Sequence, residues 1–164
     1  MKKYVFDLDQ TLYTLNDISQ LDNLNTLYKS FKPNQFLKDL LKSIPYPKYI
    51  LTNANTSHAV QVLKKLDLLS SFDDILTADH FTNLKPHPEP YNTAIEKFNL
   101  TNTENIIFFE DNIFNLETAK NYYNWTTVLI HPSTQLINKP EFIDFNFSNV
   151  ENAIIFFKIK EQYC

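Results

Sequence analysis

Short apolar runs alternate with longer amphipathic segments along the chain. Each short run is mostly apolar, as expected for a strand that is buried on both faces of a parallel sheet. The longer segments carry apolar residues at the three- and four-residue spacing of a helix. This alternation predicts a three-layer, Rossmann-like α/β fold with helices on both faces of a parallel sheet. The predicted strands cover residues 4–7, 49–52, 74–77, 106–109 and 126–130.

Helical spacing of apolar residues appears after every predicted strand. The last helix is preceded by Ser148 and Glu151, which have the spacing of a capping box, and it continues through Ile154 and Phe157. No internal repeat or low-complexity linker interrupts the pattern, so we expect one domain over residues 1–164. The other predicted helices cover residues 36–44, 60–66, 91–98 and 113–123.

The composition narrows the classes of partner. The 164 residues are 43% hydrophobic, which suffices for one core, and no apolar run approaches the length of a membrane-spanning helix. The formal charge of -4 argues against nucleic acid or an anionic membrane as a partner. A single cysteine, Cys164, fits a reducing compartment, so we expect a cytoplasmic protein.

Glycine is absent, and turns that need a positive φ must therefore use Asn or Asp.

Polar residues gather where the predicted strands end. The strand ends read FDLDQT, LTNAN and FFEDN, and LKPHPEP follows the third strand. Because ligands of open α/β sheets bind beyond the carboxyl ends of the strands, we expect these side chains to share one rim. The candidate site residues are Asp7, Asp9, Thr52, Asn53, Lys85, Glu110 and Asp111.

These residue types suit phosphoryl chemistry. Asp7 and Asp9 are two residues apart on extended backbone, so one can attack a reactant while the other moves a proton. With Glu110 and Asp111 nearby, the carboxylates would repel one another unless a cation offset them, and Mg²⁺ is the hard cation that prefers such oxygen ligands. Lys85 would hold the transferring phosphoryl group. Thr52 and Asn53 would donate neutral hydrogen bonds to its oxygens.

The four motifs DxDxT, hydrophobic-Thr-Asn, Lys-Pro and Glu-Asp resemble, in order, those of the haloacid dehalogenase superfamily. The resemblance covers nearly the whole chain. Within it, FDLDQTLY, KPHPEPY and FFEDNIFNLETAKNYYNWTTVLI are most similar to the pyrimidine 5′-nucleotidase-like branch. The resemblance implies a magnesium-dependent phosphatase of small phosphate monoesters, with nucleoside 5′-monophosphates among the candidate substrates.

The resemblance also implies a role for each acid. Asp7 would form an aspartyl-phosphate that water then hydrolyses, and Asp9 would be the general acid and base. The metal ligands would be the carboxylates of Asp7 and Asp111, the backbone carbonyl of Asp9, and Glu110 directly or through a water. The dehalogenase branch lacks an acid at the position of Asp9, which argues against dehalogenation.

Simpler interpretations exist for several polar residues. Thr52 and Asn53 can instead cap the helix that follows them. Asn112 and Asn115 fit a helix start and a packing position better than they fit ligands.

Two histidines near the rim also have a simpler interpretation, and other functions of the same fold remain open. His58 and His87 lie near the rim without a partner at metal-ligand spacing, and each fits a satisfied or solvated histidine better than a catalyst. A phosphomutase, a phosphatase of polynucleotide ends, and an inactive relative that binds a phosphorylated ligand remain alternatives.

The segment between the first two motifs is shorter than a normal cap. Residues 13–32 leave room for one short helix and a turn, with Leu21, Leu24, Tyr28 and Phe31 at helical spacing. We therefore expect a reduced cap, and with it either broad specificity or a homo-oligomer whose neighbour covers the site.

Overall fold

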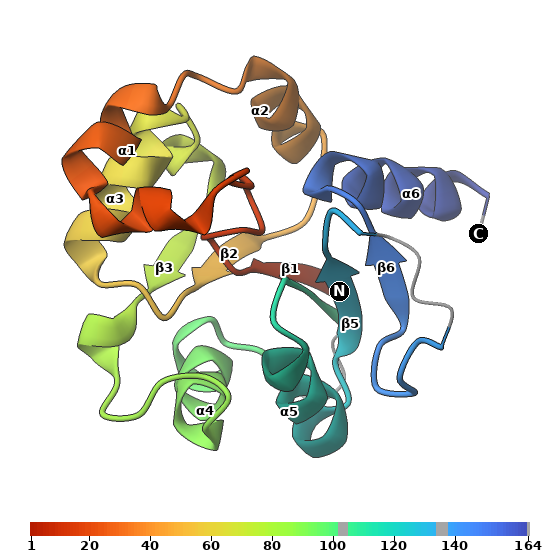
Figure 1. Ribbon diagram of the computed structural model, residues 1–164. Helices are drawn as coiled ribbons and strands as arrows, with labels where there is room; N and C mark the ends of the chain where they lie inside the picture. The colour runs from red at the N-terminus through yellow and green to blue at the C-terminus, as the bar shows by residue number, and fades with distance from the viewer. Residues whose placement is uncertain (102–104, 134–137, 164) are drawn as a thin grey trace.

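A computed structural model describes residues 1–101, 105–133 and 138–163 (Figure 1). The core is a parallel sheet with the strand order β3-β2-β1-β4-β5-β6. Every strand pair in this sheet is parallel. The strands are β1 (Lys2–Phe6), β2 (Lys48–Leu51), β3 (Asp74–Leu76), β4 (Asn105–Glu110), β5 (Thr126–Ile130) and β6 (Phe145–Phe147).

Helices cover both faces of the sheet. In Figure 1, α2, α3 and α6 lie above the strands and α4 and α5 lie below them. The predicted three-layer α/β fold is therefore confirmed. The helices are α1 (Leu24–Ser30), α2 (Gln35–Lys42), α3 (Thr56–Lys65), α4 (Pro88–Lys97), α5 (Ile113–Tyr123) and α6 (Val150–Gln162), with 3₁₀ turns η1 (Ile18–Asp22), η2 (Leu69–Ser71) and η3 (Ala78–His80).

The central strand shows why both faces need helices. Tyr4 and Phe6 point into the core beneath α2, α3 and α6, whereas Val5 points into the core formed with α4 and α5. Phe6 stacks on its cross-strand partner Phe109 with ring centroids 4.5 Å apart. Successive side chains of a strand leave opposite faces, so an almost continuous apolar run fills two cores.

Asparagine is used at many helix starts and at some of the turns of this glycine-free chain. Asn side chains cap α1, α2, α3, α5 and α6 by accepting a backbone N–H of the first turn. The positive-φ positions among the described residues are Gln10, Asp67, Asn99 and Asn124. The expected use of Asn and Asp at such turns is confirmed, and Gln10 is an addition beside the predicted site.

Two details differ from the sequence prediction. The edge strand β6 was missed, because three residues with partly buried side chains give too short a pattern. The N-cap of α6 is Asn149, whose side chain accepts from the Asn152 N–H, so the capping box assigned to Ser148 was wrong. No helix among the described residues has both the length and the apolar character needed to cross a bilayer.

The segment 13–32 forms η1 and α1, as the predicted single short helix required. Its buried residues are Leu27 and Tyr28, and Leu24 is 40% exposed. The predicted apolar stripe is therefore buried at Tyr28 and exposed at Leu24. Helical spacing did not include Leu27 in the stripe, although this residue carries much of the packing of α1.

Candidate active site

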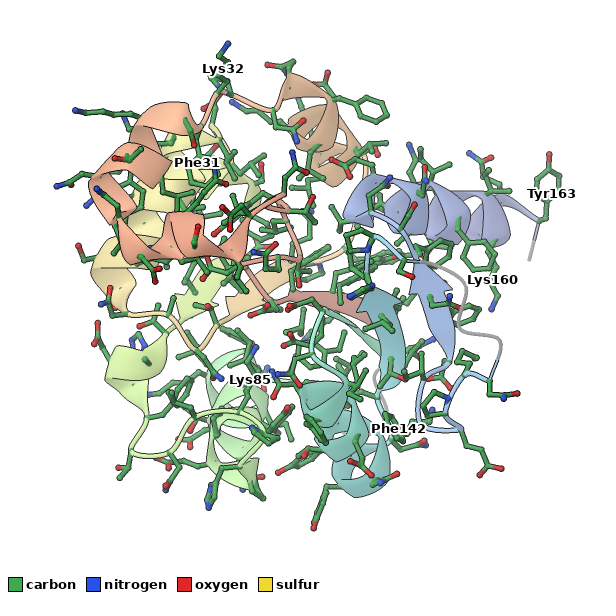
Figure 2. All side chains as sticks on the ribbon, in the orientation of Figure 1. Phe31, Lys32, Lys85, Phe142, Lys160 and Tyr163 are labelled. Carbon is green, nitrogen blue, oxygen red and sulfur yellow. The ribbon has the colours of Figure 1, made fainter. Side chains whose placement is uncertain are left out.

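The sheet brings the ends of β1, β2 and β4 side by side. Asp7 follows β1 and donates its backbone N–H to the Phe109 carbonyl at 2.9 Å. Thr52 follows β2, and Glu110 is the last residue of β4. Lys85 reaches the same point from the loop before α4, and Figure 2 shows it near the centre of the molecule. Four of the predicted residues, Asp7, Lys85, Glu110 and Asp111, thus meet in one buried group with Thr11.

Lys85 is the cationic centre of this group and is 5% exposed. Its ammonium donates to Asp7 Oδ1 at 3.0 Å, to Glu110 Oε2 at 2.8 Å and to the Leu51 carbonyl at 2.6 Å. Burial alone would lower the pKa of Lys85, but the carboxylates of Asp7 and Glu110 outweigh it and raise that pKa. The lysine is therefore charged, and its three N–H bonds fix its direction.

Glu110 uses both oxygens to organise its surroundings. Oε2 accepts from Lys85 and from Asn115 Nδ2 at 3.1 Å, while Oε1 accepts the backbone N–H groups of Asp111 and Asn112. Burial raises the pKa of Glu110. These four bonds aim the lysine and shape the loop that carries Asp111.

Asn112 and Asn115 match their simpler interpretation in part. Asn112 is the N-cap of α5 and accepts the Phe114 N–H at 2.9 Å. Asn115 is buried and packs beneath the site, but it also donates to Glu110. Its Oδ1 has no hydrogen-bond partner among the described residues. Asn115 therefore steadies the carboxylate that holds the lysine.

A second group of oxygens lies beside the lysine. Carboxylate oxygens of Asp7, Glu110 and Asp111 lie within 4.8 Å of one another. The Thr11 hydroxyl lies between two of them, 3.2 Å from Asp7 Oδ2 and 3.4 Å from Asp111 Oδ1. Such a cluster of hard oxygen donors fits a divalent cation of the Mg²⁺ type.

The electrostatics of these acids support a cation. Burial, followed by repulsion from Glu110, raises the pKa of Asp7 to about 7. Burial also raises the pKa of Asp111 to about 6. Both shifts mean that burial and mutual repulsion of the acids outweigh the compensation from Lys85, and a bound metal would supply further positive charge.

Asn53 contacts the backbone of Lys85 with both ends of its amide. Its Oδ1 accepts the Lys85 N–H at 2.9 Å, and its Nδ2 donates to the Lys85 carbonyl at 3.0 Å. Thr52 is 1% exposed and its hydroxyl oxygen accepts the Ala54 N–H at 3.1 Å. The alternative role of Thr52 and Asn53 as caps of α3 was wrong, because Asn55 fills that position.

Asp9 lies in a different environment from Asp7. Its Oδ1 accepts the Tyr13 hydroxyl proton and lies 2.7 Å from His58 Nε2. The carboxylate of Asp9 is outside the group of three acids that could hold a metal. A backbone carbonyl ligand from Asp9, as the resemblance implies, does not depend on the direction of this side chain.

Sequence reasoning missed the partners of these acids. His58 is a satisfied histidine, as expected, but one of its partners is the predicted acid and base Asp9, and the other is Tyr28. Thr11, the last residue of DxDxT, was given no role. His87 is exposed, as its simpler interpretation predicted, and its ring also caps α4 by accepting the Glu89 N–H.

A cavity of about 520 Å³ opens beside Asp111. It is bordered by the segment that leads into η1 and by the end of β5 with its following loop. Its lining residues are Gln10, Leu15, Asn16, Asp17, Ile18, Asp111, Ile130, His131 and Pro132. The cavity therefore offers space for a small organic group next to the carboxylates.

Solved structures share this fold. An L-2-haloacid dehalogenase from Xanthobacter autotrophicus has a TM-score of 0.74 at 16% identity, covering 96% of this chain and 98% of that one. A putative beta-phosphoglucomutase from Thermotoga maritima has a TM-score of 0.74 at 17% identity, covering 97% of this chain and 99% of that one. At these identities the likeness concerns the fold alone.

Curated relatives match part of the chain. A phosphorylated carbohydrates phosphatase from Thermotoga maritima is 32% identical over 82 residues, which are 50% of this chain and 38% of the relative. A phosphoglycolate phosphatase from Neisseria gonorrhoeae is 35% identical over 75 residues, which are 46% of this chain and 32% of the relative. The chain thus matches well under half the length of either relative. The sequence pattern of the haloacid dehalogenase-like hydrolases matches residues 22–128, and this chain belongs to that family.

Proposed function

We propose that the protein is a magnesium-dependent phosphatase that hydrolyses small phosphate monoesters through an aspartyl-phosphate on Asp7. The observation that carries the proposal is the contact of Asp7 with Lys85, 3.0 Å apart, beside the carboxylates of Glu110 and Asp111. A nucleophilic carboxylate next to a fixed cation and a metal-type oxygen cluster suits the attack of an anion on an anionic phosphate.

Asp7 is the proposed nucleophile. An oxygen of its carboxylate forms a bond to phosphorus as the bond to the ester oxygen breaks. The ammonium of Lys85 neutralises part of the charge on the phosphoryl oxygens, and the buried bonds from Glu110 and Leu51 keep it in place during this step. Mg²⁺ would be held by Asp7, Asp111 and the Asp9 carbonyl, and it would polarise the phosphate and offset its charge.

Asp9 is the proposed general acid and base. It gives a proton to the departing ester oxygen and then takes one from the water that attacks the aspartyl-phosphate. This second step breaks the bond between Asp7 and phosphorus and restores both carboxyl groups. A dehalogenase mechanism has no need of such an acid, so the presence of Asp9 favours phosphate ester chemistry.

Small substrates fit the space at the site. The cavity beside Asp111 has a volume of about 520 Å³, which suits the non-reacting part of a sugar phosphate, a short organic phosphate or a nucleoside 5′-monophosphate. The relatives are described as phosphatases of phosphorylated carbohydrates and of phosphoglycolate. The nucleotidase branch rests on motif resemblance and remains part of this proposal.

Turnover of p-nitrophenyl phosphate with and without Mg²⁺ tests the function directly. Asp7→Asn keeps the shape of the side chain but removes the nucleophile, so kcat should fall by more than about a hundredfold. Asp74→Asn makes the same change at an exposed residue of β3 and serves as the matched control. Retention by Asp7→Asn of more than about a hundredth of the wild-type kcat would contradict the assignment. A folded wild-type protein that binds phosphate without turnover would favour the inactive ligand-binding alternative.

A further inference from the structure

The side chain of Asp9 is held from two sides. Tyr13, at the start of the reduced cap, donates its hydroxyl proton to Asp9 Oδ1. His58, on α3, places Nε2 at 2.7 Å from the same oxygen. The second ring nitrogen of His58, Nδ1, lies 2.8 Å from the Tyr28 hydroxyl on α1. A chain of hydrogen bonds therefore connects the reduced cap to Asp9 through a core helix.

The direction of these bonds depends on which ring nitrogen of His58 carries the proton, and a proton on Nε2 suits a charged Asp9. A neutral His58 with its proton on Nε2 donates to Asp9, and Nδ1 accepts the Tyr28 proton. A doubly protonated His58 would also donate to Asp9, with Tyr28 as acceptor. In either case Asp9 Oδ1 accepts from both His58 and Tyr13, which fills the two lone-pair positions of that oxygen.

We propose that His58 is a positioning residue for the general acid and base Asp9, and that Tyr28 carries this function into the cap segment. The assignment rests on the proposed phosphatase function. With Oδ1 occupied, the proton that Asp9 transfers resides on Oδ2, the oxygen that remains for the substrate. His58 and Tyr13 thereby fix the rotation of the carboxylate, so that Oδ2 faces the departing ester oxygen.

This network gives the reduced cap a second purpose. Leu27 and Tyr28 are the buried residues of α1, and Tyr28 is only 8% exposed in its contact with His58. The segment 13–32 is short, and it contributes both hydroxyl groups of the network. The cap therefore orients the catalytic acid, while the strand ends hold the phosphate.

Leaving-group dependence separates this role from plain packing. An alkyl phosphate must receive a proton as its P–O bond breaks, because an alkoxide is a poor leaving group. The p-nitrophenolate ion departs without that proton. Loss of a positioned acid should therefore slow the alkyl ester selectively, whereas general damage to the fold should slow both esters alike.

The experiment compares kcat/KM for propyl phosphate and p-nitrophenyl phosphate. We use kcat/KM because it reports the steps up to formation of the aspartyl-phosphate. For His58→Leu we expect a loss of about a hundredfold or more on propyl phosphate, within the range of general acid catalysis. The loss on p-nitrophenyl phosphate should stay below about tenfold. His58→Gln should recover part of the alkyl activity, because the Gln amide can donate to Asp9 in place of Nε2.

Tyr28→Phe provides a milder variant that keeps His58 in place and should lower the alkyl activity selectively. Tyr123→Phe removes a hydroxyl that bonds Asn92 and the Pro88 carbonyl and takes no part in the hydrogen bonds of Asp9, so it should leave the ratio of the two activities unchanged. Equal losses on the two esters for His58→Leu and Tyr28→Phe would overturn the positioning role alone. Absence of turnover by the wild-type protein on both esters would overturn the proposed function and this assignment with it.

Discussion

Asn53 holds the backbone of Lys85 through two hydrogen bonds, with Oδ1 at 2.9 Å from the Lys85 N–H and Nδ2 at 3.0 Å from the Lys85 carbonyl. The side-chain amide of Asn53 thus pairs with the backbone N–H and C=O of Lys85, as a neighbouring strand would. This contact fixes the loop from which the lysine reaches Asp7. In the proposed function, Asn53 would consequently act on a bound phosphate through Lys85, in addition to any direct bond that it donates.

Asn53→Ala should lower kcat/KM for p-nitrophenyl phosphate by about ten- to a hundredfold, because a misplaced Lys85 binds the developing charge less well. Asn53→Asp keeps the acceptor for the Lys85 N–H and should lose less. Steady-state kinetics measure both effects. Asn92→Ala alters an exposed amide of α4 and is the control. An Asn53→Ala enzyme with wild-type kcat/KM would show that the contact with the loop is dispensable.

Lys85→Met should destabilise the metal-free protein, because Asp7 and Glu110 would lose the buried cation between them. Removal of one partner of a buried ion pair typically costs about 3–5 kcal/mol of unfolding free energy. The loss should be larger at pH 8 than at pH 5, since the two carboxyl groups can take up protons at the lower pH. Urea denaturation in EDTA at both pH values measures it. An equal loss at both would argue against uncompensated carboxylates.

The metal-free wild-type protein should itself lose stability as pH rises from about 4 to 7. The pKa of Asp7 is raised to about 7 and that of Asp111 to about 6, so the folded state binds protons that the unfolded state has released. The stabilisation from these groups is complete below their ordinary pKa values and is lost as pH passes their raised ones. Thermal melts in EDTA across this range measure the effect. Other titrating groups also change the melting temperature with pH, and Asp7→Asn, which lacks the carboxyl group of Asp7, shows how large their contribution is.

Mg²⁺ should reverse this loss, because it binds the carboxylates in their charged form. The rise in melting temperature caused by Mg²⁺ should therefore be small near pH 5 and large near pH 8. At a hundredfold excess over Kd, binding to the folded state contributes about 2.7 kcal/mol. Asp111→Asn should reduce the shift, and Asp22→Asn, in exposed η1, should not. A melting temperature that does not change with Mg²⁺ at pH 8 would contradict a metal site in this carboxylate group.

The reduced cap should limit discrimination among substrates. If light scattering shows a monomer, we expect the preference among small phosphate monoesters to stay below about a thousandfold, or roughly 4 kcal/mol. If it shows a homo-oligomer, the neighbouring subunit would cover the site and the preference can be sharper.

Tyr28 is not a contact between such subunits, because it is buried against His58. Exposed apolar residues beside the site, Ile18 at 70% and Phe114 at 60%, are better candidates. A monomer with a stronger preference would show that the short segment is an effective lid.

The sequence alone predicted the layers of the fold and the rim of the sheet. Apolar runs that lack alternation require burial on both faces, as Val5 and Phe6 show by entering different cores. Parallel strands place their carboxyl ends together, so Asp7, Lys85, Glu110 and Asp111 could be grouped without coordinates. The edge strand β6 escaped this reasoning, because a short strand at the edge of the sheet lacks the continuous apolar run.

Only the tertiary structure decided which group each polar side chain contacts. His58 is 49 residues from Asp9 and 30 from Tyr28, and nothing in local spacing relates the three. Periodicity specifies the face on which a residue lies, whereas a hydrogen bond needs donor and acceptor within about 3 Å and in a given direction. Loop conformation and side-chain rotation set that direction. For the same reason, the sequence predicted that Asn53 lies at the rim, and the fold determined that its amide holds Lys85.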